Sequence, residues 1–115
     1  MNQPERREAS ALQKTSVLEA LKDPNGHSIY KNGRDYLRRL GFDPFRVVID
    51  DLVDYLESGC RLYLLPDDPR KFQCCLRYEE KLIIHVKIAP SEEEGRFMVF
   101  LGFHPHNTGY APLPC

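Results

Sequence analysis

The sequence has no long apolar run, no strong net charge and no apolar leader segment. No stretch reaches the roughly 18–20 apolar residues that a membrane-spanning helix needs, so we expect no membrane association. Residues 1–14 are polar and lack the apolar core of a signal peptide, so we expect a cytoplasmic protein. A net charge of −1 argues against nonspecific nucleic-acid binding by bulk charge, although it permits a local basic site.

Motifs that identify common enzyme classes are also missing. There is no glycine-rich phosphate loop, no G-x-S-x-G elbow and no H-E-x-x-H motif. Cys74 and Cys75 are adjacent in an expected strand, so they point to opposite faces and cannot hold one metal ion as a C-x-x-C pair does. We therefore expect free cysteines and no metal or other cofactor. One zinc site stays open as an alternative, with the ligands Cys60, His85, His104 and Cys115.

The chain has the length and composition of one globular domain, with 115 residues, of which 42% are hydrophobic and 29% charged. We expect a polar N-terminal extension with a short helix over residues 1–25. A single α+β domain is expected over 26–107. The segment 108–115 is rich in proline, which excludes regular structure, so we expect an irregular tail.

Three helices are expected in the first half of the chain. Ser16 and Glu19 fit a capping box at the start of the first helix, which should end at the Pro- and Gly-containing turn 23–26. A second helix is expected over 28–40. The third, over 43–59, has apolar residues at helical spacing and acidic residues mainly on its other side, so it should lie on an apolar surface.

The second half changes to the two-residue period of strands. Helices followed by strands with hairpin-length connections predict an α+β fold with an antiparallel sheet. A charged loop is expected at 90–95. The expected strands cover residues 61–65, 71–78, 81–88 and 96–104.

The expected strand 81–88 has an apolar face and a polar face. Alternation places Leu82, Ile84, Val86 and Ile88 on the face toward the helices, and Ile83, His85 and Lys87 on the other. Side chains of the neighbouring strands can reach the same polar face, although spacing does not fix the register. These side chains are Gln73, Arg77 and His104.

This group of side chains fits RNA cleavage by attack of the 2′-hydroxyl. A base takes the hydroxyl proton, an acid protonates the leaving 5′-oxygen, and cations stabilise the charge on phosphate. Histidine suits either proton transfer without a metal. The alternative is that these are ordinary solvated residues of a half-exposed sheet. Tyr63, Phe72 and Tyr78 are candidates for base stacking, but cross-strand packing is the expected role.

Several segments between residues 33 and 107 carry a family resemblance: Arg-Arg-Leu-Gly-Phe-Asp at 38–43 with Val-Val-Ile at 47–49, the stretch 63–69 ending in Pro-Asp-Asp-Pro, Ile-Ile-His-Val-Lys-Ile at 83–88, and the strand 99–105. On these segments the chain resembles a widespread bacterial family of small uncharacterised domains. That family is grouped with the RelE-like, barnase/EndoU/colicin-type ribonuclease toxins, with MqsR and BrnT as better-known relatives.

The resemblance implies an α+β fold with helices on one face of a curved, about four-stranded antiparallel sheet and substrate on the open face. It implies an mRNA interferase-like toxin that cuts RNA, free or on the ribosome. A cognate protein antitoxin is implied as its partner, and the toxin would be a monomer or homodimer. The competing hypothesis is a non-catalytic protein-binding module of toxin-like fold, which the acidic side of helix 43–59 favours.

The resemblance also implies roles for individual residues. Gln73 follows Phe72 as in the aromatic–glutamine pair of MqsR, and His85 and His104 stand where that toxin has an active-site tyrosine and a lysine. We therefore expect His85 and His104 to be general base and acid, with Gln73 orienting phosphate or base. The expected substrate-binding residues are Arg77, Lys87, Tyr63 and Lys71.

Overall fold

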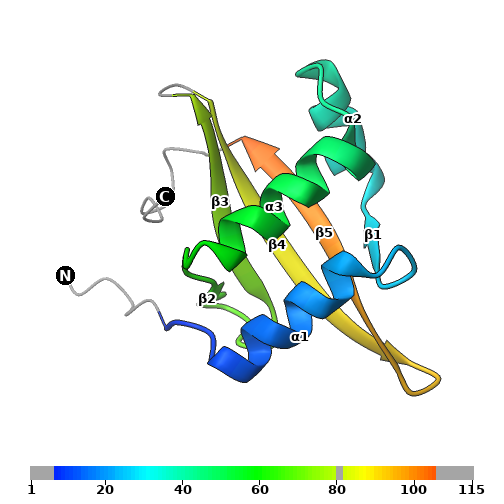
Figure 1. The fold of residues 1–115 in the computed structure, drawn as a ribbon, viewed down its shortest axis with the longest axis vertical. Helices are drawn as coiled ribbons and strands as arrows, with labels where there is room; N and C mark the ends of the chain where they lie inside the picture. Colours follow the sequence, from blue (N-terminus) through cyan, green and yellow to red (C-terminus); the bar gives the residue numbers. More distant parts are fainter. Residues whose placement is uncertain (1–6, 80–81, 106–115) are drawn as a thin grey trace.

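The structure confirms the expected α+β class, although one short strand lies between the first two helices. The computed structural model describes residues 7–79 and 82–105. The elements are α1 (Ala11–Lys22), β1 (His27–Ile29), α2 (Lys31–Arg39), a π-helical segment η1 (Pro44–Val48), α3 (Ile49–Glu57), β2 (Tyr63–Leu64), β3 (Phe72–Glu79), β4 (Leu82–Glu93) and β5 (Arg96–Pro105) (Figure 1). The expected tail 108–115 lies outside the described residues.

The sheet differs from the expected four antiparallel strands. The described residues form an open mixed sheet of five strands in the order β1-β5-β4-β3-β2, in which β1 pairs with β5 in parallel. Residues 28 and 29 were expected to begin the second helix. Ile29 instead pairs with Leu101 and is buried, and Tyr30 caps α2. A strand of three residues is too short to show a period, so its pairing with β5 decided its structure.

The core lies between the helices and one face of the sheet. In Figure 1, α1 and α3 run across the strands β3, β4 and β5. Three of the four expected apolar positions of β4 are confirmed, because Ile84, Val86 and Ile88 are fully buried. Leu82, at the start of the strand, is only half-buried. Each fully buried side chain contributes about 1.5–3 kcal/mol when removed from water. Their partners in the same core include Val17, Leu37, Leu52, Leu56, Val99, Leu101 and Phe103.

The first helix begins six residues before the expected capping box. Ser10 is the N-cap: its hydroxyl accepts from the Gln13 amide at 3.1 Å, and its own amide donates to Gln13 Oε1 at 2.8 Å. Ser16, expected to be the cap, instead donates to the Leu12 carbonyl inside the helix. The chain before α1 is anchored where Ala9 donates to the Leu62 carbonyl at 2.7 Å. This contact fixes the entry into the helix, and the local Ser-Glu spacing does not reveal it.

The hairpin between β4 and β5 replaces the expected loop at 90–95. β4 continues to Glu93, and the turn consists of Glu94 and Gly95, both with positive φ (54° and 74°). Two central residues with positive φ are typical of the tight turns that join twisted strands. Pro90 pairs with Val99, beyond the last register pair of β3 with β4, so one edge of β4 is free there. A free edge tolerates the missing N–H of proline.

None of the helices in the described part of the chain has both the length and the apolar character needed to cross a membrane.

Candidate functional site

Five of the predicted site residues lie on the sheet face opposite the core, which we call the polar sheet face. It is defined here by Gln73 and Arg77 of β3, His85 and Lys87 of β4, and His104 of β5. Phe72, Cys74 and Leu76 pack in the core, so the alternate residues of β3 face the other way. The same alternation places Phe103 in the core and His104 on the polar sheet face.

The two histidines are direct neighbours across the sheet. His85 and His104 are register partners in the antiparallel pair β4–β5, and Cys75 is the partner of His85 on β3. Direct partners of this kind have Cα atoms about 4.5–5.5 Å apart, with their side chains on the same face. The structure therefore brings together two imidazoles that are 19 positions apart in sequence.

Lys87 lies in the next row of the sheet, between Gln73 on β3 and Gly102 on β5. Both imidazoles are directed toward this row. His85 Nε2 lies 3.0 Å from Gln73 Oε1. His104 Nε2 lies 3.2 Å from the position that a Cβ atom on Gly102 would occupy. Lys87 is therefore flanked by Gln73, which the His85 imidazole approaches, and by Gly102, which the His104 imidazole approaches.

Gln73 orients the imidazole of His85. Its amide nitrogen donates to the Leu64 carbonyl at 3.4 Å, so its amide oxygen faces His85 and accepts from Nε2. The neutral ring then carries its proton on Nε2 and its lone pair on Nδ1. Gln73 is 9% exposed and belongs to the buried residues. A buried amide with both ends bonded holds its partner in one geometry.

The surroundings of His104 favour its neutral form. Burial lowers the pKa of His104 below its ordinary value of 6.5, and the charge of Lys87 lowers this pKa further. Both effects disfavour a second positive charge at this point. At neutral pH the ring is therefore mostly unprotonated and can accept a proton.

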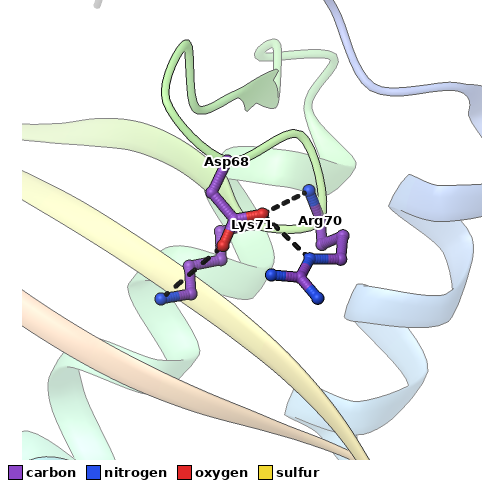
Figure 2. A network of polar contacts seen from close by, with 3 residues as sticks. All are labelled: Asp68, Arg70 and Lys71. Atoms are coloured by element: carbon purple, nitrogen blue, oxygen red, sulfur yellow. Dashed lines mark hydrogen bonds and ion pairs between the residues drawn. The ribbon is translucent and has the colours of Figure 1, made fainter.

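Two of the predicted substrate-binding residues lie in different surroundings. Tyr63 pairs with Gln73 but is only 5% exposed, packed with Cys75 and Ile83, so little of its ring is accessible to a base. Lys71 is exposed and precedes β3. Its ammonium lies 3.9 Å from Asp68, whose other carboxylate oxygen accepts from Arg70 Nε at 3.1 Å (Figure 2).

Phe72 and Tyr78 confirm the packing role. Phe72 is 5% exposed and belongs to the core. Tyr78 packs against the same core, its ring 4.5 Å from that of Phe42. Both side chains lie on the helix side of the sheet, so neither reaches the polar sheet face.

The cysteines correct one expectation and weaken the zinc alternative. Cys60 and Cys74 are free thiols, but Cys75 is disulfide-bonded. Burial, and to a smaller extent the nearby Cys60, raise the pKa of Cys74 to about 12. Cys60 lies near the buried Cys74 and therefore on the core side of the sheet, away from both histidines. Cys115 lies outside the described residues. The described residues contain no cluster of three metal-ligating side chains.

Sequence reasoning missed two aromatic residues beside the site. The rings of Tyr30 and Phe100 stack with centroids 5.9 Å apart and planes 25° apart, and Tyr30 is 52% exposed. Tyr30 Cδ2 lies 3.8 Å from the same Cβ position on Gly102 that His104 approaches. The pairing of β1 with β5 brings Tyr30 here. Because β1 was not predicted, the sequence placed Tyr30 inside the expected helix 28–40 and gave no signal that it reaches this site.

A hollow lies beside α3 and the end of β3, with a volume of about 450 Å³. Burial, and then the carboxylate of Asp51, raise the pKa of Tyr78 in its wall. Burial also raises the pKa of Tyr55. The hollow therefore combines two carboxylates and two phenols with Arg77, which also belongs to the polar sheet face. It is lined by Asp51, Asp54, Tyr55, Ser58, Leu76, Arg77 and Tyr78.

No family model, no curated protein and no solved structure matches this chain, so its function has to be inferred from the geometry of the site.

Proposed function

We propose that the protein is an endoribonuclease that cleaves RNA by attack of a 2′-hydroxyl on the adjacent phosphate, without a metal. The observation that carries this proposal is the cross-strand pair His85–His104, with Lys87 between the residues that the two imidazoles approach. Two imidazoles and a fixed cation are the groups that this reaction needs. The resemblance to RelE-like toxins supports an mRNA interferase whose partner is a cognate protein antitoxin.

His104 acts as the general base and His85 as the general acid. The lowered pKa of His104 keeps its ring neutral near pH 7, ready to take the 2′-hydroxyl proton. The 2′-oxygen then bonds to phosphorus and the bond to the 5′-oxygen breaks. Protonated His85, oriented by Gln73, gives its proton to that leaving oxygen. The products are a 2′,3′-cyclic phosphate and a free 5′-hydroxyl.

The charges on the polar sheet face favour an anionic ligand. Arg77 and Lys87 are exposed there, and they stabilise the negative charge that grows on the phosphate oxygens. The acidic residues Asp50, Asp54 and Glu57 belong to α3, which packs on the other side of the sheet. Segregation of this kind gives a local positive field in a chain of net charge −1.

The test is cleavage of a labelled single-stranded RNA by the parent and by His85→Ala and His104→Ala. We expect each substitution to lower the rate by about 10²–10⁴-fold, the usual contribution of one proton-transfer group. His27→Gln is the matched control, because His27 lies on β1 and bonds to the Ala20 carbonyl away from the pair. A 2′,3′-cyclic phosphate end and resistance to EDTA are expected. Equal cleavage by parent and His85→Ala would disprove the assignment.

Growth and total RNA integrity on induced expression test the toxin part of the proposal separately. We expect growth arrest with RNA fragments for the parent, and normal growth for the double variant His85→Ala/His104→Ala. Normal growth with intact RNA in cells that contain folded parent protein would contradict both the toxin and the ribonuclease assignments.

The hollow between α3 and β3 favours a second candidate function, a non-catalytic protein-binding module. Its acidic wall would recognise a basic segment of a partner. In that case the parent leaves RNA intact, and charge removal by Asp51→Asn/Asp54→Asn abolishes partner binding. The ribonuclease proposal predicts that the same double substitution keeps cleavage dependent on both histidines. The rate should change only as far as the two carboxylates act on Arg77, which lines the same hollow.

A further inference from the structure

Helix α2 lies beside the strand that carries His104. The Cβ atom of an alanine at position 33 would lie 3.0 Å from the backbone nitrogen of Phe103, so α2 approaches β5 at the level of residues 102–104. Figure 1 shows α2 following β1, the edge strand that lies next to β5. The stacked rings of Tyr30 and Phe100 stand where this helix begins.

One flank of α2 continues from Tyr30 as a basic ridge. Arg34 and Arg38 follow Tyr30 at intervals of four residues, so the three share a flank, and the two arginines lie about one turn of 5.4 Å apart. Neither arginine takes part in an ion pair among the described residues. Nε of Arg34 is shielded from solvent and has no hydrogen-bond partner in that part of the chain.

The other flank of the helix has a different role. Tyr36 packs against the core, burial raises its pKa, and the charge of Arg39 partly offsets this rise. Arg39 therefore lies on the Tyr36 side of α2. The neighbours Arg38 and Arg39 thus have the same charge and similar exposure but point to different sides of the helix.

We propose that Tyr30, Phe100, Arg34 and Arg38 bind single-stranded RNA next to the phosphate that is cleaved. The aromatic pair stacks against one base, and the two arginines hold phosphates of the strand as it leaves the histidine pair along α2. An unpaired strand is required because the stacking faces of bases in a duplex are already covered. The identity of the ligand as RNA rests on the proposed function.

The test measures binding rather than cleavage. A fluorescent single-stranded oligonucleotide with 2′-O-methyl groups lacks the attacking hydroxyl, so the parent binds it without cutting. We expect Tyr30→Ala to weaken binding about 5- to 100-fold, the range of one lost base stack. Arg38→Gln should weaken binding severalfold and lower the salt dependence by about one phosphate contact. Arg39→Gln and the exposed aromatic variant Phe45→Ala are the matched controls.

The outcomes separate this inference from the proposed ribonuclease activity. Parental affinity of Tyr30→Ala, or equal losses for Arg38→Gln and Arg39→Gln, would overturn the inference even if the parent cleaves RNA. No binding of the oligonucleotide by the parent would also overturn it. If Tyr30→Ala and Arg38→Gln lose affinity while His85→Ala and His104→Ala change nothing in a cleavage assay, the binding surface stands and the catalytic assignment fails. Thermal melting of each variant checks that the fold is kept.

Discussion

His104 Nε2 lies 3.2 Å from the point where a Cβ atom on Gly102 would stand. The ring thus occupies space that glycine leaves open, and it approaches the strand position paired with Lys87. Gly102 has no positive φ that would require glycine. The imidazole is therefore the group that a side chain at this position would meet first.

Gly102→Ala should displace the His104 ring and leave the fold intact. The new methyl group forces the imidazole away by a few tenths of an ångström, and we expect cleavage to fall about tenfold, because proton transfer needs close geometry. Stability should stay within about 1 kcal/mol of the parent or rise, because alanine is less costly than glycine in a strand. Cleavage rates and thermal melting test both effects, and an unchanged rate would show that the ring position is not used.

Lys87→Gln should raise the pKa of His104 toward 6.5, since one of the two effects that lower it is removed. The pKa of His104 is lower in the folded protein than in the unfolded chain, where it is about 6.5. The neutral ring therefore contributes to the free energy of unfolding, and this contribution is fully present above about pH 6.5. This contribution is lost as the pH falls through the folded value. NMR titration of the imidazole protons in parent and variant measures the shift. A His104 pKa that does not move would contradict the electrostatic effect of Lys87.

Gln73→Leu should release His85 from its fixed orientation. The leucine has a similar volume but leaves His85 Nε2 and the Leu64 carbonyl without their amide partner, so we expect a loss of about 1–3 kcal/mol in stability. The turnover rate should fall at least tenfold with little change in KM, because the positioned acid is affected and phosphate binding is not. Tyr63→Phe is the control: it keeps the buried ring, and we expect parental kinetics.

The free thiols should react at very different rates with iodoacetamide. Cys74 is fully buried and its pKa is raised to about 12, so almost none of it is thiolate at neutral pH. Cys60 is partly exposed and should be alkylated in the native protein. Mass spectrometry of peptides from native and denatured samples tests this order. Equal labelling of both residues in the native state would contradict the burial of Cys74.

Gly33→Ala should destabilise the contact between α2 and β5. The added Cβ would lie 3.0 Å from the backbone nitrogen of Phe103, which cannot move aside as a side-chain end can. We expect a cost of about 1–3 kcal/mol, the usual effect of overpacking. Asp35→Ala on the exposed side of the same helix is the control and should stay within about 0.5 kcal/mol of the parent. Denaturant unfolding of the three proteins measures both values.

Local patterns predicted the long elements and the polarity of their faces. The alternation in β4 separated Ile84 and Val86 from His85 and Lys87, and the structure buries the first pair in the core. This was predictable because the two-residue period is a property of one strand. The helical spacing of α3 likewise identified the buried Leu52 and Leu56.

Contacts between distant segments decided what the sequence left open. The parallel pairing of β1 with β5 and the burial of Tyr63 both depend on residues far apart in the chain.

The sequence by itself determined that His85 and Lys87 share a polar face, because that follows from the period of a single strand. Only the tertiary structure decided that His104 is the partner of His85 and that Tyr30 stands beside them. Strand register and helix docking are set by the packing of the whole core, and a slip of one residue would turn each side chain to the opposite face.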